Sequence, residues 1–161
     1  MITAHLPAGY LTGRAFAIAG PTLWAAVLGG ILPDFDLIWF YLIDDRAFHH
    51  HHYLVHVPAF WAAIALVVFP LIRVFQPRWT WPAIAFFAAL FVHICLDAIA
   101  GGIKWFWPFS NELFYIVTVE AVQRHWLLNF IIHPIFLLEI AIWIAAFVVW
   151  HRTRRARQRK A

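Results

Sequence analysis

Long apolar runs alternate with short polar clusters along this sequence, and the runs have the lengths of membrane-spanning helices. Three of them, residues 54–75, 81–100 and 127–150, reach the roughly 20 residues that an α-helix needs to cross a bilayer. A sustained alternation of polar and apolar positions, which would indicate β-strands, does not occur. We therefore expect an all-α, multi-pass membrane helical bundle with about four to five apolar helical segments.

The remaining apolar runs are shorter. Residues 5–19 and 21–32 are separated by the Gly20-Pro21 pair, a strong turn signal, and predict a helical hairpin. The run 35–43 is too short to span a bilayer and predicts an interfacial helix. Residues 103–122 mix aromatic and polar positions and predict a loop with a short helix.

The composition places this fold in a lipid bilayer. The chain has 161 residues, of which 64% are hydrophobic and only 12% are charged, and its mean hydropathy is +0.76. Soluble domains carry roughly 25% charged residues, and a water-soluble core cannot absorb this much apolar surface. We expect one membrane-embedded helical domain over residues 1–150, with the bilayer as its partner.

Positive charge gathers at the end of the chain. The formal net charge is +4, and the stretch HRTRRARQRK ends the sequence just before Ala161. Such a tail either binds nucleic acid or anchors a membrane helix at the cytoplasmic surface. The positive-inside rule favours the anchor, so we expect no nucleic-acid partner and a basic cytoplasmic tail at residues 151–161.

The same rule orients the spans. With the tail inside, the third span begins outside, the second begins inside near Arg73 and Arg78, and the first begins outside. Because the predicted hairpin turns at Gly20-Pro21, His5 at its start lies at the same outer level as Asp34. Histidines and aspartates then gather near the outer face, and the candidates are His5, Asp34, Asp36, His51, His56, His93 and Asp97.

His93 and Asp97 are four residues apart inside a span, so they share one helix face. This spacing suits two ligands of one metal, or a ligand and its orienting carboxylate. The alternative is a polar pair that binds no metal, but an ionisable pair inside a span indicates function. Either Asp34 or Asp36 could cap the helix that follows. A cap needs only one residue, however, so the second aspartate indicates a further role.

The run His49–His52 leaves one choice open. On a helix, His52 and His56 would share a face, whereas His51 and His56 would lie about 140° apart. A loop that leads into the helix removes this objection, so spacing alone does not choose between His51 and His52. His133 lies at about the depth of His93, and a histidine hydrogen-bonded between helices is the favoured interpretation there.

Imidazole and carboxylate ligands suit zinc, and also iron or manganese. We expect one or two divalent ions, most simply zinc. Groupings of the Ser-His-Asp type, phosphate-binding glycine loops and paired CxxC motifs do not occur in the sequence. This argues against serine-based catalysis and nucleotide binding.

An ordered set of short motifs carries a family resemblance. The motifs are AHxxxG from His5 to Gly9, LPDFD at residues 32–36, HxxxxH from His51 to His56, HxxxD from His93 to Asp97, and WPF at residues 107–109. The set covers residues 3–109 and resembles the membrane-bound metal-dependent hydrolases, small inner-membrane proteins related to the LexA-regulated hydrolase. It is distantly similar to zinc-dependent phospholipase C.

This resemblance implies an inner-membrane location, and it implies that His51 rather than His52 is a ligand and that His5 joins the site. The sequence departs from the family pattern, which usually reads His-Arg and then Thr-His across the HxxxxH motif. Here the corresponding pairs are His51-His52 and Val55-His56.

The predicted activity is metal-dependent hydrolysis of a phosphoester in a lipid-like substrate. The metal would activate a water, and Asp36 would take the proton of that water. Arg46, Lys104 or Arg124 would bind the anionic head group. The alternatives are a non-catalytic membrane scaffold with a structural metal site, and a transport or metal-handling protein.

One further expectation concerns charge inside the membrane. Glu139 lies within the last apolar run, where an unpaired charge is unfavourable. If His5 and His133 begin at one level, Arg14 and Glu139 reach similar depths at 1.5 Å per residue. We therefore expect Arg14 and Glu139 to form a pair, with a protonated Glu139 in a polar pocket as the alternative.

Overall fold

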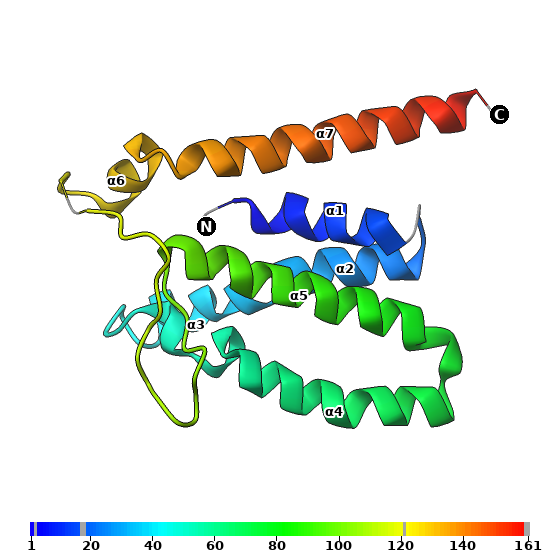
Figure 1. Cartoon of the computed structure of the whole chain (residues 1–161), viewed down its shortest axis with the longest axis horizontal. Helices are drawn as coiled ribbons and strands as arrows, with labels where there is room; N and C mark the ends of the chain where they lie inside the picture. The colour runs from blue at the N-terminus through cyan, green and yellow to red at the C-terminus, as the bar shows by residue number, and fades with distance from the viewer. Residues whose placement is uncertain (2, 17–18, 121, 160–161) are drawn as a thin grey trace.

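The computed structural model describes residues 1, 3–16, 19–120 and 122–159. Long helices lie side by side in it, and the all-α prediction is confirmed (Figure 1). The α-helices are α1 (His5–Phe16), α2 (Pro21–Ile31), α3 (Asp36–Leu42), α4 (Pro58–Phe75), α5 (Thr80–Ala100), α6 (Trp126–Ile132) and α7 (Phe136–Gln158). Short 3₁₀ turns precede α3, α4 and α5, and they are η1 (Pro33–Phe35), η2 (His50–His52), η3 (Leu54–His56) and η4 (Pro77–Trp79).

Three of the helices are long and apolar enough to cross a membrane: α4, α5 with the preceding η4, and α7. A fourth crossing would form if α2 and α3 act as one span bent by 51° at Leu32. The side chains of α4 include no buried residue, and Leu66 is 78% exposed. Such an apolar exterior fits contact with lipid rather than water.

The predicted third span, 127–150, is not one helix. It is broken between Ile132 and Phe136, where α6 ends and α7 begins. Pro134 causes the break, because proline has no N–H and disfavours helical geometry in the preceding residue. The ring of His133 accepts a hydrogen bond from the Ile135 N–H at 3.2 Å and so caps the break. Residues 151–158 of the predicted basic tail are helical and form the last turns of α7.

The short helix predicted within residues 103–122 does not form in the described part of that segment, 103–120. The segment instead closes over the end of α5. An isolated antiparallel bridge pairs Ile103 with Phe114. The N–H of Ile116 donates to the Ala98 carbonyl at 3.0 Å, which supplies a partner at the end of α5, where helix carbonyls lack one.

The predicted pair between Arg14 and Glu139 is wrong. Glu139 accepts a hydrogen bond from the Thr3 N–H, whereas Arg14 donates to the Thr153 hydroxyl at 2.7 Å. Thr153 is 14 residues beyond Glu139, which corresponds to about 21 Å along α7. The prediction took His133 as the start of the span, but the break at Pro134 shifts α7 so that Glu139 is level with Thr3.

Glycines let α1, α2 and α5 pack closely. A β-carbon at Gly9 would lie 2.9 Å from the Ala26 carbonyl oxygen and 3.1 Å from the α-carbon of Gly30. A β-carbon at Gly29 would lie 2.2 Å from the Phe86 carbonyl oxygen. Backbones that approach this closely are typical of helix packing in membranes. The packing holds the start of α1 beside the ends of α2 and α5.

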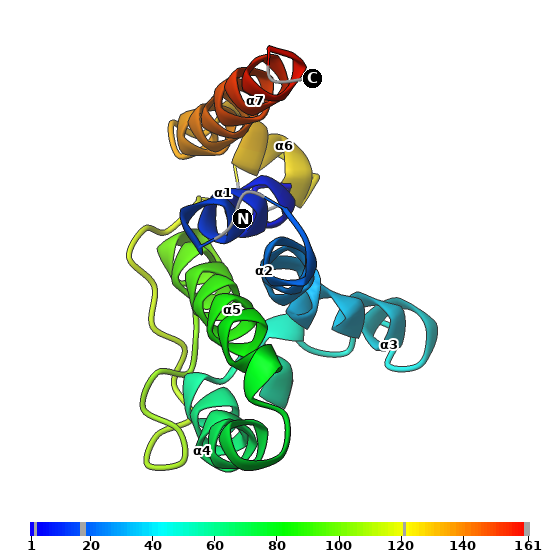
Figure 2. The same cartoon turned by 90° about the vertical axis from the view of Figure 1, so that its right-hand side faces the viewer.

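The helices are arranged so that different elements lie at the two ends of the bundle. The start of α1, the end of α5, α3 and the loop beyond α5 lie at one end, shown on the left in Figure 1. The C-terminus, the α1–α2 turn and the α4–α5 connection lie at the other end. Figure 2, which looks along the bundle, shows α7 beside α1 and remote from α4.

Candidate metal centre

All seven predicted ligands meet at the first of these ends. The centre of the cluster is the carboxylate of Asp97 in the last turn of α5, and this residue is 1% exposed. Its Oδ2 lies 3.0 Å from Nε2 of His93 and 3.6 Å from Nε2 of both His51 and His56. Its Oδ1 lies 3.0 Å from Nε2 of His5. The Met1 amino group donates to the same Oδ1 at 2.8 Å.

The two aspartates of the LPDFD motif face different parts of the cluster. Oδ1 of Asp34 lies 3.7 Å from Nε2 of His93 and 3.9 Å from Nε2 of His56. Oδ2 of Asp36 lies 3.2 Å from Nδ1 of His56. Phe35 occupies the N-cap position of α3 and makes no side-chain cap. Neither carboxylate caps α3, and both lie close to the imidazole rings.

Backbone carbonyls fix the orientation of two imidazole rings. Nδ1 of His93 donates to the Gly30 carbonyl at 2.7 Å. Nδ1 of His51 lies 2.9 Å from the carbonyl oxygens of both Gly101 and Gly102. Since a carbonyl only accepts, the proton of each neutral ring sits on Nδ1 and the lone pair of Nε2 points into the cluster. Metal-ligating histidines are held in this way by outer hydrogen bonds.

The structure distinguishes His51 from His52. The 3₁₀ turn η2 buries the His51 ring against Asp97, whereas His52 is exposed and its ring packs near Phe48. Sequence reasoning missed His50, whose Nδ1 lies 3.5 Å from Oδ1 of Asp36. Spacing rules for α-helices and loops gave no signal for His50, because a 3₁₀ turn decides which ring of the run points inward.

His133 stays outside both groups of residues that could hold an ion. Those groups are His5, Asp34, His93 and Asp97 in one, and His50, His51 and His56 in the other. Within each group, one ligand atom per residue lies within 4.8 Å of all the others. Tetrahedral ligands about 2.05 Å from a zinc ion would be roughly 3.3 Å apart. The contacts at Asp97, from 3.0 to 3.6 Å, bracket that spacing.

A family model described as YdjM inner membrane protein matches residues 1–158. The chain belongs to the YdjM inner membrane protein family. A search of curated proteins finds no match to it, and neither does a search of solved structures. The family match confirms the predicted inner-membrane location. Hydrolase activity and similarity to phospholipase C stay predictions for this YdjM-family protein.

Burial favours the uncharged form of His51 and His56 in this YdjM-family protein. Removal from water lowers the pKa of His51 well below its usual value, and the neighbouring Asp97 opposes that shift only in part. Burial likewise lowers the pKa of His56, against the opposing effect of the nearby Asp36 carboxylate. Neutral imidazole is the form that binds a metal, so these rings are ready to ligate near pH 7.

Several polar atoms in the cluster are buried without a hydrogen-bond partner among the described residues. They include Nε2 of His56 and His93, Oδ2 of Asp97 and both carboxylate oxygens of Asp36. Buried polar atoms are normally hydrogen-bonded. Nε2 of His51, His56 and His93 all face Oδ2 of Asp97, and cations bound among these atoms would satisfy them. The donor set therefore fits a divalent metal.

Two cavities reach the aspartates. One, of about 450 Å³, is lined by Asp34, Arg46 and His50 together with aromatic residues of α3. The other, of about 530 Å³, is lined by Asp36 and mainly apolar residues such as Trp39 and Trp61. Of the three predicted head-group cations, Arg46 alone is among the described residues that line these two cavities.

Proposed function

We propose that this YdjM-family protein is a membrane-bound, metal-dependent hydrolase that cleaves a phosphoester in a lipid-like substrate. One observation carries the proposal: a buried cluster of imidazole and carboxylate atoms, several without hydrogen-bond partners among the described residues, borders both a cavity with an arginine and an apolar cavity. The cluster supplies ligands, the arginine supplies a counter-charge for phosphate, and the apolar cavity accepts a hydrocarbon group.

The geometry supports two ligand sets. His5, Asp34, His93 and Asp97 would hold one divalent ion, most simply zinc. His51 and His56, with His50 or Asp36, would hold a second. When bound, such an ion polarises a phosphoryl oxygen and lowers the pKa of a bound water. The carbonyls of Gly30, Gly101 and Gly102 keep the rings in the ligating tautomer.

Asp36 is the general base in this proposal. Its carboxylate oxygens are buried without a partner among the described residues, and one of them lies 3.2 Å from His56. Asp36 also lines the apolar cavity, whereas Asp34 lines the other one. A carboxylate in this position accepts the proton of the attacking water, and His50 and His56 stabilise its charge.

Arg46 is the group that recognises the phosphate. Arg46 lines the cavity that reaches Asp34, its side chain is 63% exposed, and its guanidinium lies 4.0 Å from the carboxylate of the neighbouring Asp45. Planar guanidinium binds phosphate oxygens in pairs. Phe35 and Trp39, which line the second cavity, are 52% and 56% exposed and extend the apolar surface outward. A lipid-like substrate would thus enter from the bilayer.

The test is to purify the full chain without a metal-loaded resin, measure its zinc, and assay phosphate release from short-chain phosphatidic acid. We expect zinc-dependent release that Asp36→Asn lowers at least about a hundredfold while leaving the first metal ion in place. Zinc at full stoichiometry without hydrolysis of this lipid or of bis(p-nitrophenyl) phosphate would reject the proposed activity.

A structural metal site is the second candidate, because His56 and His93 are almost completely buried. Structural zinc sites are closed by four protein ligands, whereas catalytic sites keep an open position. Cobalt substitution separates the two. A cobalt absorption spectrum that changes when phosphate is added indicates an open position, and one that does not change supports the structural role.

A further inference from the structure

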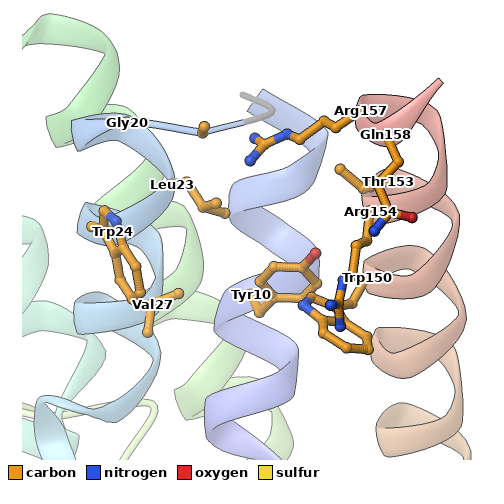
Figure 3. A pocket seen from close by; sticks show the side chains of 11 residues that line it. Tyr10, Gly20, Leu23, Trp24, Val27, Trp150, Thr153, Arg154, Arg157 and Gln158 are labelled. Carbon is orange, nitrogen blue, oxygen red and sulfur yellow. The ribbon is translucent and has the colours of Figure 1, made fainter. Parts of the chain in front are cut away.

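A second site lies at the opposite end of the molecule, between α7 and the α1–α2 hairpin. Figure 3 shows Trp24 and Val27 of α2 on one side, Trp150 and Thr153 of α7 on the other, and Tyr10 of α1 between them. The cavity there has a volume of about 500 Å³. None of its lining residues belongs to the metal centre.

This cavity continues into an apolar groove of about 510 Å³ along the same helices. The two share Tyr10, Trp24, Val27 and Trp150. The groove is lined almost entirely by apolar atoms and reaches Trp143 on α7. The eleven residues from Trp143 to Arg154 correspond to about 16 Å of helix. This length is close to half of the roughly 30 Å hydrocarbon core of a bilayer.

The far end of the groove is basic. Arg154 and Arg157 both line the cavity of about 500 Å³ into which the groove opens, and their spacing of three residues places them on one face of α7. The Arg154 guanidinium lies 5.5 Å from the centre of the Trp150 ring, a cation–π contact that holds it at the groove. The hydrogen bond from Arg14 to Thr153 brings a third cation to this end. Carboxylates are not among the described residues that line the cavity.

We propose that this groove binds one anionic glycerophospholipid. The phosphate would lie between Arg154 and Arg157, and an acyl chain would follow the apolar groove toward Trp143. Trp24 and Trp150, 69% and 44% exposed, would lie at the boundary between head group and chain, where tryptophan is favoured. The charge selects an anionic lipid, and the length matches a lipid of a single leaflet.

The experiment is native mass spectrometry of the full chain in a neutral detergent, with phosphatidylglycerol or phosphatidylcholine added. We expect one phosphatidylglycerol to bind at least about tenfold more tightly than phosphatidylcholine, as two interfacial arginines allow. Arg154→Gln with Arg157→Gln should remove this preference. The matched control is Arg152→Gln with Arg155→Gln, which removes the same charge from the same helix outside the groove.

Equal losses in the two double variants would indicate diffuse attraction to a basic helix and would overturn the site. Equal binding of both lipids would overturn it too, as would a dimer of this chain that excludes lipid. Full displacement by glycerol 3-phosphate would show that a soluble phosphate is the ligand instead. Val27→Trp, which fills the groove without touching its charge, should weaken lipid binding, whereas Leu66→Trp on the lipid face of α4 should not.

Discussion

The imidazole ring of His51 packs directly against the backbone of Gly101. A β-carbon at Gly101 would lie 2.2 Å from Cε1 of the His51 ring, and the Gly101 carbonyl accepts a hydrogen bond from Nδ1 of that ring at 2.9 Å. This glycine therefore both admits the ring and sets its tautomer. The position of a loop ligand thus depends on a residue at the end of a spanning helix.

Gly101→Ala should accordingly weaken metal binding without removing any ligand. The added methyl group must push the His51 ring away from Asp97, and loss of an outer hydrogen bond typically lowers metal affinity by about 10- to 100-fold. Titration with a zinc chelator measures the change. Ala100→Ser is the control at the neighbouring position, and unchanged zinc affinity in Gly101→Ala would contradict this role.

The two central ligands of α5 should be indispensable for metal binding. His93→Ala and Asp97→Ala each remove a buried group that faces several others, so we expect metal content to fall by at least about tenfold as the ligand set is broken. His133→Ala, a histidine outside the cluster, serves as the control and should keep its metal. Elemental analysis measures the metal content of the purified variants. Stoichiometric metal in both α5 variants would exclude the site.

His51 and His52 should differ sharply despite being adjacent. His51 is buried against Asp97 and His52 is exposed, so His51→Ala should lower metal affinity while His52→Ala should leave it unchanged. Isothermal titration with zinc on the metal-free protein gives both affinities. A larger loss in His52→Ala than in His51→Ala would show that the loop is arranged differently.

Close packing of the hairpin should make Gly9 critical for stability. Gly9→Ala places a methyl group 2.9 Å from the Ala26 carbonyl, so α1 and α2 must separate, and overpacking of this kind costs about 1–3 kcal/mol. Thermal unfolding in detergent should show a lower midpoint. Ala62→Val adds apolar atoms on the exposed surface of α4, where lipid molecules can move aside. It should therefore have little effect on stability.

Hydrophobicity alone was enough to predict α4, α5 and the α1–α2 hairpin, because the bilayer demands long apolar helices and few other solutions exist. The same reasoning, applied to charge, placed the seven candidate ligands at one end of the bundle. The break at Pro134 was missed because the apolar run continues on both sides of it. The roles of Gly30 and Gly101 could not be predicted, because they depend on tertiary contacts with His93 and His51.

The orientation in the membrane remains a prediction that labelling can test. The metal centre and the basic end of α7 lie at opposite ends of the bundle, so they should face opposite sides. On a Cys95→Ala background, a membrane-impermeant maleimide should label Asn111→Cys in cells whose inner membrane is intact. It should label Ala156→Cys only after that membrane is opened. Labelling of both positions from one side would refute this orientation.

The separation of Arg14 from Glu139 predicts independent energetics. Arg14 binds Thr153 near the basic end, and Glu139 binds the Thr3 backbone about 21 Å away along α7. Groups this far apart contribute additively to stability, within about 0.3–0.5 kcal/mol. Arg14→Gln and Glu139→Gln should therefore each destabilise the protein in detergent, and the double variant should lose the sum of the two. A double variant that is more stable than this sum would mean that the two charges interact after all, and that α1 and α7 pack in a different register.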